Sequence, residues 1–241
     1  MSSRQPVALV TGGTKGIGAA VVAMLVGRGY QVYVTYAHDE VAANSLCQQW
    51  GDSVVTFKAD QSVRADTYSL VRFLRKQAVS LACIVCNTGL TVRKHFLDTS
   101  DEDWDSMMEC SVNSNVILLR ELFPLIADGG RIIFTGSSMG IHPHATVLGY
   151  GVAKAAVHAL VKNLVKVFES KQVTVNAVAP GFVETEWQRR KPEVVRQNIC
   201  RKTALHRFAS PDEVASAFAF CLDNSYVNGS VIEVDGGYNY Q

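Results

Sequence analysis

The chain lacks an excess of charge of either sign. Its 241 residues carry 23 lysines and arginines against 22 aspartates and glutamates, which gives a formal net charge of +1 at pH 7. Domains that bind nucleic acid usually carry a clear basic excess. The balance therefore argues against nucleic acid as a main partner, although a balanced net charge still allows a local basic patch.

Long apolar segments are also missing. No stretch approaches the roughly 18 uncharged apolar residues that indicate a membrane-spanning helix. The first residues, MSSRQPVALVTGG, contain no long apolar core of the kind that a secretion signal has. We therefore expect a cytoplasmic protein without a membrane partner.

Cysteines are few, and their spacing does not suit zinc. Of the six, only Cys83 and Cys86 form a CxxC pair, and no second pair stands at zinc spacing. The apolar run LACIVCN around them predicts a buried strand, in which thiols act as small hydrophobic side chains in a reducing compartment. His142 and His144 have no cysteine or carboxylate at ligand spacing nearby, so no metal site is expected.

Apolar runs and helical patterns alternate from one end of the chain to the other. Hydrophobic residues make up 48% of the chain, enough for one large core. The expected strands are 7–12, 31–36, 53–60, 81–87, 131–136, 173–180 and 230–237. The expected helices are 17–29, 40–50, 64–77, about 101 to 130, 148 to about 170, and 210–222. This α/β order, with no Pro/Ser-rich linker, predicts a single domain over 1–241. That domain is expected to be a doubly wound, seven-stranded parallel sheet flanked by helices.

A glycine-rich loop joins the first expected strand to the first expected helix. The segment LVTGGTKGIGAAV spaces Gly12, Gly16 and Gly18 as G-x3-G-x-G. Glycines at this place let the backbone approach a pyrophosphate, and a helix N-terminus supplies N–H donors. The spacing differs from the G-x-G-x-x-G dinucleotide motif, so a glycine-rich structural turn is the alternative.

The residues after the second expected strand bear on the choice of cofactor. An acidic residue there often binds the ribose hydroxyls of NAD. Here the strand ends at Tyr36, and the first carboxylate, Asp39, comes three residues later, while Lys15 lies inside the glycine loop. A cation without a carboxylate suits a 2′-phosphate. We therefore expect NADP(H), with NAD(H) as the alternative. The competing interpretation of Lys15 and His38 is that both are solvated loop residues.

Six short motifs, together with Asp60 after the third expected strand, stand along the chain in a fixed order. They are TGGTKGIG at 11–18, CNTG at 86–89, GSSMG at 136–140, YGVAK at 150–154, APGFVETE at 179–186 and VNGSVIEVDGG at 227–237. Over essentially the whole length the chain resembles the short-chain dehydrogenase/reductase family, and most of all its 3-oxoacyl-acyl-carrier-protein reductase branch. The resemblance implies a Rossmann fold and hydride transfer between a nicotinamide cofactor and a carbonyl compound.

The resemblance implies a catalytic set of Asn113, Ser137, Tyr150 and Lys154. Ser137 would hydrogen-bond the substrate oxygen, and Asn113 would continue a proton relay through water to the lysine. Ser138 and Asn115 are the neighbouring alternatives, and a capping or helix-bending role is the alternative for Asn113.

Tyr150 and Lys154 are four residues apart, so they share one face of a helix. Carbonyl reduction needs a proton on the oxygen, and a phenol with an ordinary pKa of about 10 can supply it. A nearby ammonium stabilises the phenolate, so we expect Lys154 to lower the pKa of Tyr150. By resemblance, Lys154 also binds the nicotinamide ribose.

The resemblance assigns the cofactor to about residues 1–135 and catalysis and substrate to about 136–241. The chain departs from the family's NNAG motif at Cys86 and Thr88. The expected cofactor-binding residues are Gly12, Thr14, Lys15, Gly16, Ile17, Gly18, Tyr36, His38, Asp60, Gln61, Asn87, Gly89, Tyr150, Lys154, Pro180, Gly181, Val183 and Thr185.

The expected function is that of an NADPH-dependent carbonyl reductase acting on 3-oxoacyl thioesters in fatty acid synthesis, with an acyl carrier protein as a partner. The alternatives are an alcohol, steroid or sugar dehydrogenase, or a catalytically idle dinucleotide-binding regulator. The segment LFPLIADGGRII lacks the basic cluster that many carrier-dependent reductases have before the fifth strand. The remaining basic candidates for docking a carrier, otherwise a solvated helix face, are Lys171, Arg189, Arg190 and Lys191.

The segment AAVHALVKNLVKVF at 155–168 is apolar over more than one face of its expected helix. The family's usual assembly is a tetramer. We therefore expect a homotetramer.

Overall fold

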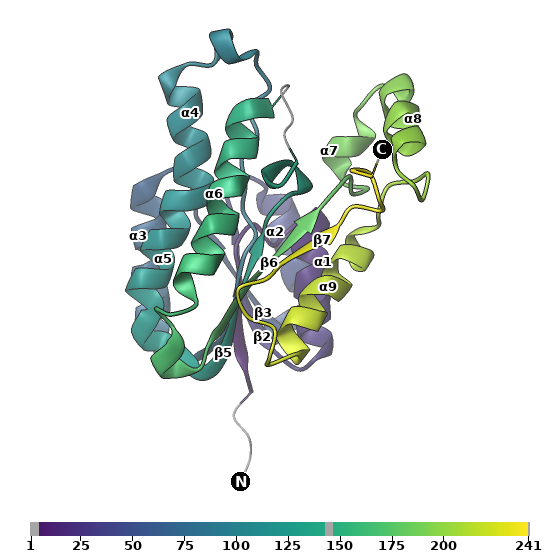
Figure 1. Cartoon of the computed structure of the whole chain (residues 1–241). Coiled ribbons are helices and arrows are strands. Elements are labelled where there is room, and N and C mark those ends of the chain that lie inside the picture. The colour runs from purple at the N-terminus through teal and green to yellow at the C-terminus, as the bar shows by residue number, and fades with distance from the viewer. Residues whose placement is uncertain (1–4, 143–146, 241) are drawn as a thin grey trace.

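One parallel sheet organises the molecule (Figure 1). The computed structural model describes residues 5–142 and 147–240, except for the side chain of Trp187, so His144 lies outside the described residues. The strand order is β3-β2-β1-β4-β5-β6-β7. The strands are β1 (Val7–Val10), β2 (Gln31–Tyr36), β3 (Val54–Lys58), β4 (Leu81–Cys86), β5 (Ile126–Thr135), β6 (Thr174–Pro180) and β7 (Val231–Val234).

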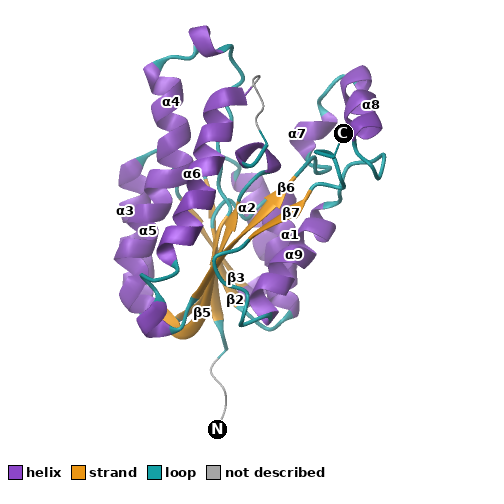
Figure 2. Ribbon diagram, in the orientation of Figure 1, coloured by secondary structure: helices purple, strands orange, loops and turns teal. Residues whose placement is uncertain are grey.

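Helices cover both faces of the sheet (Figure 2). The helices α3, α4, α5 and α6 lie on one face, and α1, α2 and α9 lie on the other. The helices are α1 (Gly16–Gly27), α2 (Glu40–Trp50), α3 (Arg64–Gln77), α4 (Asp101–Met108), α5 (Ser114–Leu122), α6 (Leu148–Leu164), α7 (Glu186–Arg189), α8 (Glu193–Lys202) and α9 (Pro211–Asp223). The predicted doubly wound α/β fold with seven parallel strands is confirmed.

Each central strand feeds two hydrophobic cores. In β1, Leu9 packs into the core on the α3, α5 and α6 side, whereas Ala8 and Val10 pack into the core on the α1 and α9 side. All three side chains are fully buried. Because both faces of such a strand are covered, its sequence is a continuous apolar run rather than an alternating one.

The CxxC pair is part of these cores. Cys83 and Cys86 on β4 belong to opposite cores and are 1% and 2% exposed. Burial raises the pKa of the Cys83 thiol to about 12 and also raises the pKa of Cys86, so both thiols are protonated and unreactive. Within residues 5–142 and 147–240, no group of three or more His, Cys, Asp or Glu could hold a metal ion. No helix of this described part is long and apolar enough to cross a membrane.

The predicted long helix from 101 to about 130 is wrong in two respects. It breaks into α4, a π-helical turn named η3 (Glu109–Asn113), and α5, and it ends before Pro124, which cannot continue it. The ADGG segment that suggested a helix end belongs to β5. There the pairing with β4 shifts between Leu81↔Ile126 and Cys83↔Arg131, so the extra residues form a bulge.

Two further boundaries differ from the sequence prediction. Helix α6 ends at Leu164, and the chain reaches residue 171 through a turn and a single 3₁₀ turn. Residues 186–202 form α7 and α8, which project beyond the carboxyl ends of the strands (Figure 1). Only Ile199 of α8 is buried. Because α8 is mostly polar, its sequence lacks the apolar periodicity that predicts a helix.

Candidate active site

The glycine loop after β1 has a backbone that only glycine adopts easily. Gly12 and Gly16 have φ values of +60° and +54°. A Cβ on Gly18 would lie 2.3 Å from the Gly12 carbonyl oxygen. The loop leads into α1, a 12-residue helix whose N-cap, Lys15, makes no side-chain capping bond. The free N–H groups and the helix dipole at this end form a cradle for an anion such as a pyrophosphate.

A cleft of about 470 Å³ opens above this loop, at the carboxyl ends of the strands. It brings together predicted residues from both halves of the chain, from the glycine loop to the start of α6. Three of its residues were not predicted: Thr91, Thr135 and Glu186. The lining residues are Lys15, Gly16, Ile17, Gly18, Asn87, Gly89, Thr91, Thr135, Tyr150, Lys154, Thr185 and Glu186.

The other predicted cofactor residues lie outside the lining of this cleft. Gly12 and Thr14 belong to the glycine loop itself. Tyr36 ends β2, His38 follows that strand, and Asp60 and Gln61 follow β3. Pro180 is the last residue of β6, and Gly181 and Val183 follow it. A Cβ on Gly181 would lie 2.8 Å from the Asp235 Cα, so this glycine allows the chain after β7 to pass closely.

The segments that follow β2 and β3 contact one another through the side chain of Asp60. The His38 ring lies 3.3 Å from an Asp60 carboxylate oxygen, and the same carboxylate accepts hydrogen bonds from Ser62. Gln61 is only 1% exposed, and both polar atoms of its side chain have no hydrogen-bond partner among the described residues. The Gln61 side chain is therefore enclosed within the protein.

Asn87 ties three strand ends together under the cleft. Its side-chain nitrogen donates to the carbonyl oxygens of Thr11 and Gly12 at 3.1 and 2.9 Å, and its side-chain oxygen accepts from the Thr135 hydroxyl at 2.9 Å. Every polar atom of the amide is used within the protein. Thr88, in place of the family's alanine, sets its hydroxyl 3.0 Å from where a Gly12 Cβ would be. The side chains of Asn87 and Thr88 therefore pack against Gly12 of the glycine loop.

Lys154 is buried at the floor of the cleft, with 2% of its surface exposed. Its Nζ donates to the Thr135 carbonyl oxygen at 2.6 Å. Burial lowers the pKa of this ammonium to about 8, and the thiols of Cys110 and Cys86 act in the opposite direction. A Cβ on Gly89 would lie 3.1 Å from Nζ, so that glycine leaves the ammonium open to the cleft.

Tyr150 and Ser137 face one another beside this lysine. Burial raises the pKa of the Tyr150 phenol above its usual value, and a side-chain hydrogen bond with Ser137 acts to lower it. The predicted lowering of the pKa by Lys154 is therefore wrong in this structure, where Nζ lies 5.7 Å from the centre of the phenol ring. Ser137, rather than Ser138, is the serine bonded to Tyr150, and it also accepts a hydrogen bond from the Met139 N–H at 3.2 Å.

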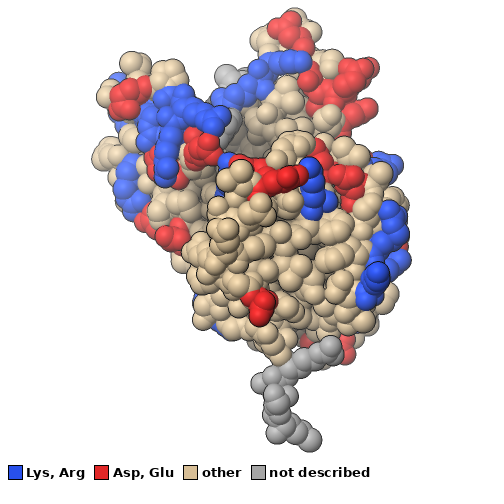
Figure 3. Space-filling view, turned by 180° about the vertical axis from the view of Figure 1, so that it is seen from behind, with Lys and Arg blue, Asp and Glu red and all other residues tan. Residues whose placement is uncertain are grey.

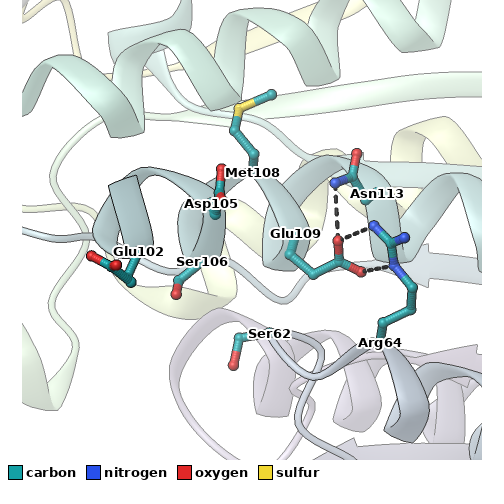
Figure 4. A pocket seen from close by; sticks show the side chains of 8 residues that line it. All are labelled: Ser62, Arg64, Glu102, Asp105, Ser106, Met108, Glu109 and Asn113. Carbon is teal, nitrogen blue, oxygen red and sulfur yellow. Dashed lines mark hydrogen bonds and ion pairs between the residues drawn. The ribbon is translucent and has the colours of Figure 1, made fainter. Parts of the chain in front are cut away.

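Asn113 does not join these residues. Its side-chain nitrogen donates to Glu109 at 3.0 Å, and Glu109 forms a two-bond ion pair with Arg64 (Figure 4). These groups line a separate pocket between the start of α3 and α4, together with Ser62. Ser111, on the same π-helical turn, is the fully buried residue, and its hydroxyl has no partner among the described residues. Asn115, the alternative, donates to the Ser111 carbonyl oxygen and is also buried.

Lys15 stands at the other end of the cleft, with its ammonium between two carboxylates. It forms an ion pair with Asp39, the N-cap of α2, and another with Glu186, the first residue of α7, at 3.2 Å. The hydrogen bond to Asp39 is the main cause of the raised pKa of Lys15. The side chains of all three residues are between 39% and 53% exposed. The sequence gave no indication that Asp39 and Glu186 meet at this lysine.

Charges of both signs gather around the hollow of the molecule (Figure 3). Arg189 lies 3.4 Å from Glu184, and Arg190 pairs with Glu186. Lys171, below the other end of β5, lies 3.5 Å from Asp128. His142 pairs with Glu233 of β7 at 2.9 Å and is held at the edge of the site. Three of the four basic residues that the sequence offered for docking an acidic carrier, Lys171, Arg189 and Arg190, are thus partly neutralised by acidic neighbours, whereas the fourth, Lys191, lies over the Phe182 ring.

The comparisons with known proteins agree with this geometry. A family model described as "Enoyl-(Acyl carrier protein) reductase" matches residues 12–239. The 3-oxoacyl-[acyl-carrier-protein] reductase of Salmonella typhimurium is 31% identical, covering 98% of each chain. A tropinone reductase homolog of Arabidopsis thaliana is 35% identical, covering 96% of this chain and 91% of the relative.

A solved structure of similar shape carries a bound nucleotide. It is a blue fluorescent protein from a metagenomic library, in complex with NADPH. It superposes with a TM-score of 0.91 at 26% identity and covers 97% of both chains. Fold, sequence and cleft together show that this chain belongs to the short-chain dehydrogenase/reductase family and is an NAD(P)-dependent oxidoreductase.

Proposed function

We propose that the protein is an NADPH-dependent carbonyl reductase. The observation that carries the proposal is the cleft that joins the glycine cradle to Tyr150 and Lys154, with Ser137 hydrogen-bonded to Tyr150. Hydride transfer to a carbonyl needs a dinucleotide site next to a proton donor, and the cleft offers both.

The residues of the cleft fit a nicotinamide dinucleotide. The positive-φ glycines and the α1 N-terminus suit the pyrophosphate, and Lys154 is placed to bind ribose hydroxyls through the proton donors that Thr135 does not use. The bound nicotinamide would supply the hydride. This division of roles supports our proposal that about residues 1–135 serve mainly the cofactor and 136–241 mainly catalysis.

The chain supplies the proton and fixes the carbonyl. The raised pKa keeps Tyr150 protonated at neutral pH, so its O–H is available to the developing alkoxide. Ser137 accepts from Met139, so its own O–H is a donor, which is bonded to Tyr150 in this structure and would turn to the same substrate oxygen when a carbonyl binds. The Lys154 ammonium then stabilises the phenolate after the proton has left. Asn113 is proposed at most as a distant support, because its amide is bonded to Glu109.

NADP(H) is our proposal for the cofactor, with NAD(H) as the alternative. Lys15 is the cationic residue at the end of the cleft away from Lys154, where it could contact a 2′-phosphate, and the NADPH complex of similar fold supports this choice. Asp39 opposes it, because its carboxylate already binds the Lys15 ammonium. NADPH binding therefore requires Lys15 to exchange a carboxylate for a phosphate.

We propose short 3-oxoacyl thioesters as the substrates. The likeness to the Salmonella 3-oxoacyl-[acyl-carrier-protein] reductase supports this class. An acidic carrier would dock on basic residues, but Arg189 and Arg190 are each paired with a glutamate. We therefore expect only a modest preference for a carrier-bound form. The likeness to a tropinone reductase homolog favours a simple ketone as the second candidate.

The test is a substrate panel read by NADPH absorbance. It should contain acetoacetyl thioester, carrier-bound 3-oxoacyl thioester, simple and bicyclic ketones, a steroid and a sugar. We expect the short thioester to be reduced, with a kcat/KM ratio between carrier-bound and free forms that shrinks as salt is raised. Good activity on ketones without any on thioesters would overturn the substrate class while retaining the reaction class. No activity on any member would favour an idle dinucleotide-binding regulator.

A homotetramer is our proposal for the assembly. Val116 on α5 and Leu148 and Val152 on α6 are about 40% exposed (40%, 39% and 42%), and both helices cover the same face of the sheet. Apolar side chains on adjacent helices suit an interface between copies of the chain. Light scattering at micromolar concentration should give four times the chain mass, and a monomer mass would refute the proposal.

A further inference from the structure

His158 is a buried histidine that the chemistry above leaves unused. It lies one turn beyond Lys154 on α6, is 7% exposed, and does not line the cleft. Its ring fits a slot left by two glycines. A Cβ on Gly136 would lie 2.2 Å from the His158 Nε2, and a Cβ on Gly140 would lie 2.9 Å from its Cε1. These glycines flank Ser137, so the ring sits directly behind the segment that carries the catalytic serine.

The ring binds both ends of that segment. The backbone N–H of Ser137 donates to the His158 Nε2 at 3.3 Å, and the ring makes a second hydrogen bond to the Gly140 backbone. Because Nε2 accepts, the proton of the neutral ring is on Nδ1, and the Gly140 carbonyl is the backbone group that can accept it. One tautomer of one side chain therefore holds the turn from Ser137 to Gly140.

The surroundings keep this ring neutral. Burial lowers the pKa of His158 to about 4, and the positive charges of Lys154 and Lys162 act in the same direction. A neutral ring keeps its lone pair on Nε2 at physiological pH. The same bond also satisfies a buried N–H of Ser137 that would otherwise lose a hydrogen bond on folding.

The direction of the Ser137 hydroxyl depends on this backbone. Ser137 is the N-cap of the 3₁₀ turn η5 (Ser138–Gly140), with φ −164° and ψ 146°, and its Oγ accepts from the Met139 N–H. A hydroxyl that accepts on one side presents its hydrogen on the other, toward Tyr150 and the cleft. Rotation of the Ser137 amide would turn the hydroxyl away from both.

We propose that neutral His158 is a positioning residue, which holds the Ser137–Gly140 turn so that the Ser137 hydroxyl points at the substrate oxygen. The proposal rests on the proposed carbonyl reductase function, because it gives Ser137 a role in binding the carbonyl. His158 itself touches neither cofactor nor substrate.

The experiment compares three variants with the best substrate of the panel. His158→Leu removes both ring hydrogen bonds. His158→Gln can keep an acceptor near the place of Nε2, and His158→Asn can keep only a donor near the place of Nδ1. We expect kcat to fall about tenfold or more in the Leu and Asn variants and to stay within about threefold in the Gln variant. NADPH affinity should be unchanged in all three, since the glycine cradle is untouched.

Ser137→Ala, alone and combined with His158→Leu, tests whether the histidine acts through the serine. If Ser137→Ala lowers kcat, then adding His158→Leu to it should lower kcat no further, because the histidine acts through the serine. Wild-type kcat in the Leu variant, or equal losses in folded Gln and Asn variants, would overturn the role of His158 alone. If the Leu variant does not fold, the Gln and Asn pair decides. Full activity in Ser137→Ala would overturn the role of Ser137, and the positioning role of His158 with it, whereas only a wild type that reduces no member of the panel would overturn the proposed function.

Discussion

The two ends of the cleft each hold a lysine, and the two lysines are held in opposite ways. Lys154 is buried and donates to a backbone carbonyl of β5, and burial lowers its pKa. Lys15 is half exposed between Asp39 and Glu186, and the hydrogen bond to Asp39 raises its pKa. One ammonium is bonded to the end of a sheet strand, whereas the other is held by side chains that are exposed to water.

This difference separates chemistry from recognition. A buried charge is poorly screened, so Lys154 acts strongly on nearby phenol and ribose groups, and its position cannot change without moving the strand end. Exposed ion pairs are worth little and are weakened by salt, so Lys15 can exchange one anionic partner for another. We therefore expect changes at the buried end to alter rate and those at the exposed end to alter cofactor choice.

The largest effect is expected from Tyr150→Phe. The change removes only the proton-donating oxygen, and general acid catalysis contributes about 10²–10⁴-fold to the rate. Steady-state kinetics should show kcat lowered by that factor, and fluorescence titration should show nearly unchanged NADPH affinity. Wild-type turnover in the purified variant would remove Tyr150 from the mechanism.

Lys154→Met should lose activity, and the difference in unfolding free energy between the wild type and this variant should depend on pH. Burial lowers the folded-state pKa to about 8 from an ordinary value of 10.5, so charging Lys154 costs stability below pH 8. That cost disappears as the pH rises from 8 to 10.5, because only the unfolded state then binds the proton. The wild type should therefore gain about 2–3 kcal/mol relative to the variant between pH 7 and pH 10.

Urea unfolding at several pH values measures this difference. Lys166→Met is a matched control, since its ammonium is on an exposed turn beside Glu169. A constant gap between the wild type and Lys154→Met across this range would mean that the buried ammonium is not destabilised.

Changes at the exposed end should alter the cofactor preference. Asp39→Asn keeps a capping oxygen for the Ala42 N–H and removes the charge that competes for Lys15. We expect NADPH affinity to rise about three- to tenfold at low salt, with a smaller gain at high salt, and NADH affinity to change less. Lys15→Ala should do the opposite and weaken NADPH more than NADH. Equal changes for both cofactors, measured by fluorescence titration, would exclude a 2′-phosphate contact.

The two ends also differ in how far the sequence revealed them. Tyr150 and Lys154 were predictable because a helix places residues i and i+4 on one face, and Ser137 through the GSSMG motif in which the chain resembles its family. The contacts of Lys15 were not, since Glu186 is 171 positions away and only the folded chain brings it near. Likewise, α7 and α8 lack an apolar pattern, so the local sequence did not predict these two helices.

Asn113 shows why a correct motif region can still yield a misplaced side chain. An α-helix turns about 100° per residue, and the π-helical turn from Glu109 to Asn113 inserts an extra residue into that rotation. The insertion leaves Ser111 buried and directs Asn113 toward Glu109. Periodicity alone cannot show such a turn, because the sequence of the segment remains compatible with a regular helix.

The smallest effect is therefore expected from Asn113→Ala. The change removes one hydrogen bond to Glu109, which keeps both bonds from Arg64, so we expect a loss of about 1 kcal/mol or less in unfolding free energy. The value of kcat should stay within about threefold of the wild type, because general acid catalysis by Tyr150 is untouched. Ser137→Ala, assayed in parallel, shows how far kcat falls when a hydrogen bond to the substrate carbonyl is removed. If Asn113→Ala lost as much rate as Ser137→Ala, then the π-helical turn would have to contribute to the proton path after all.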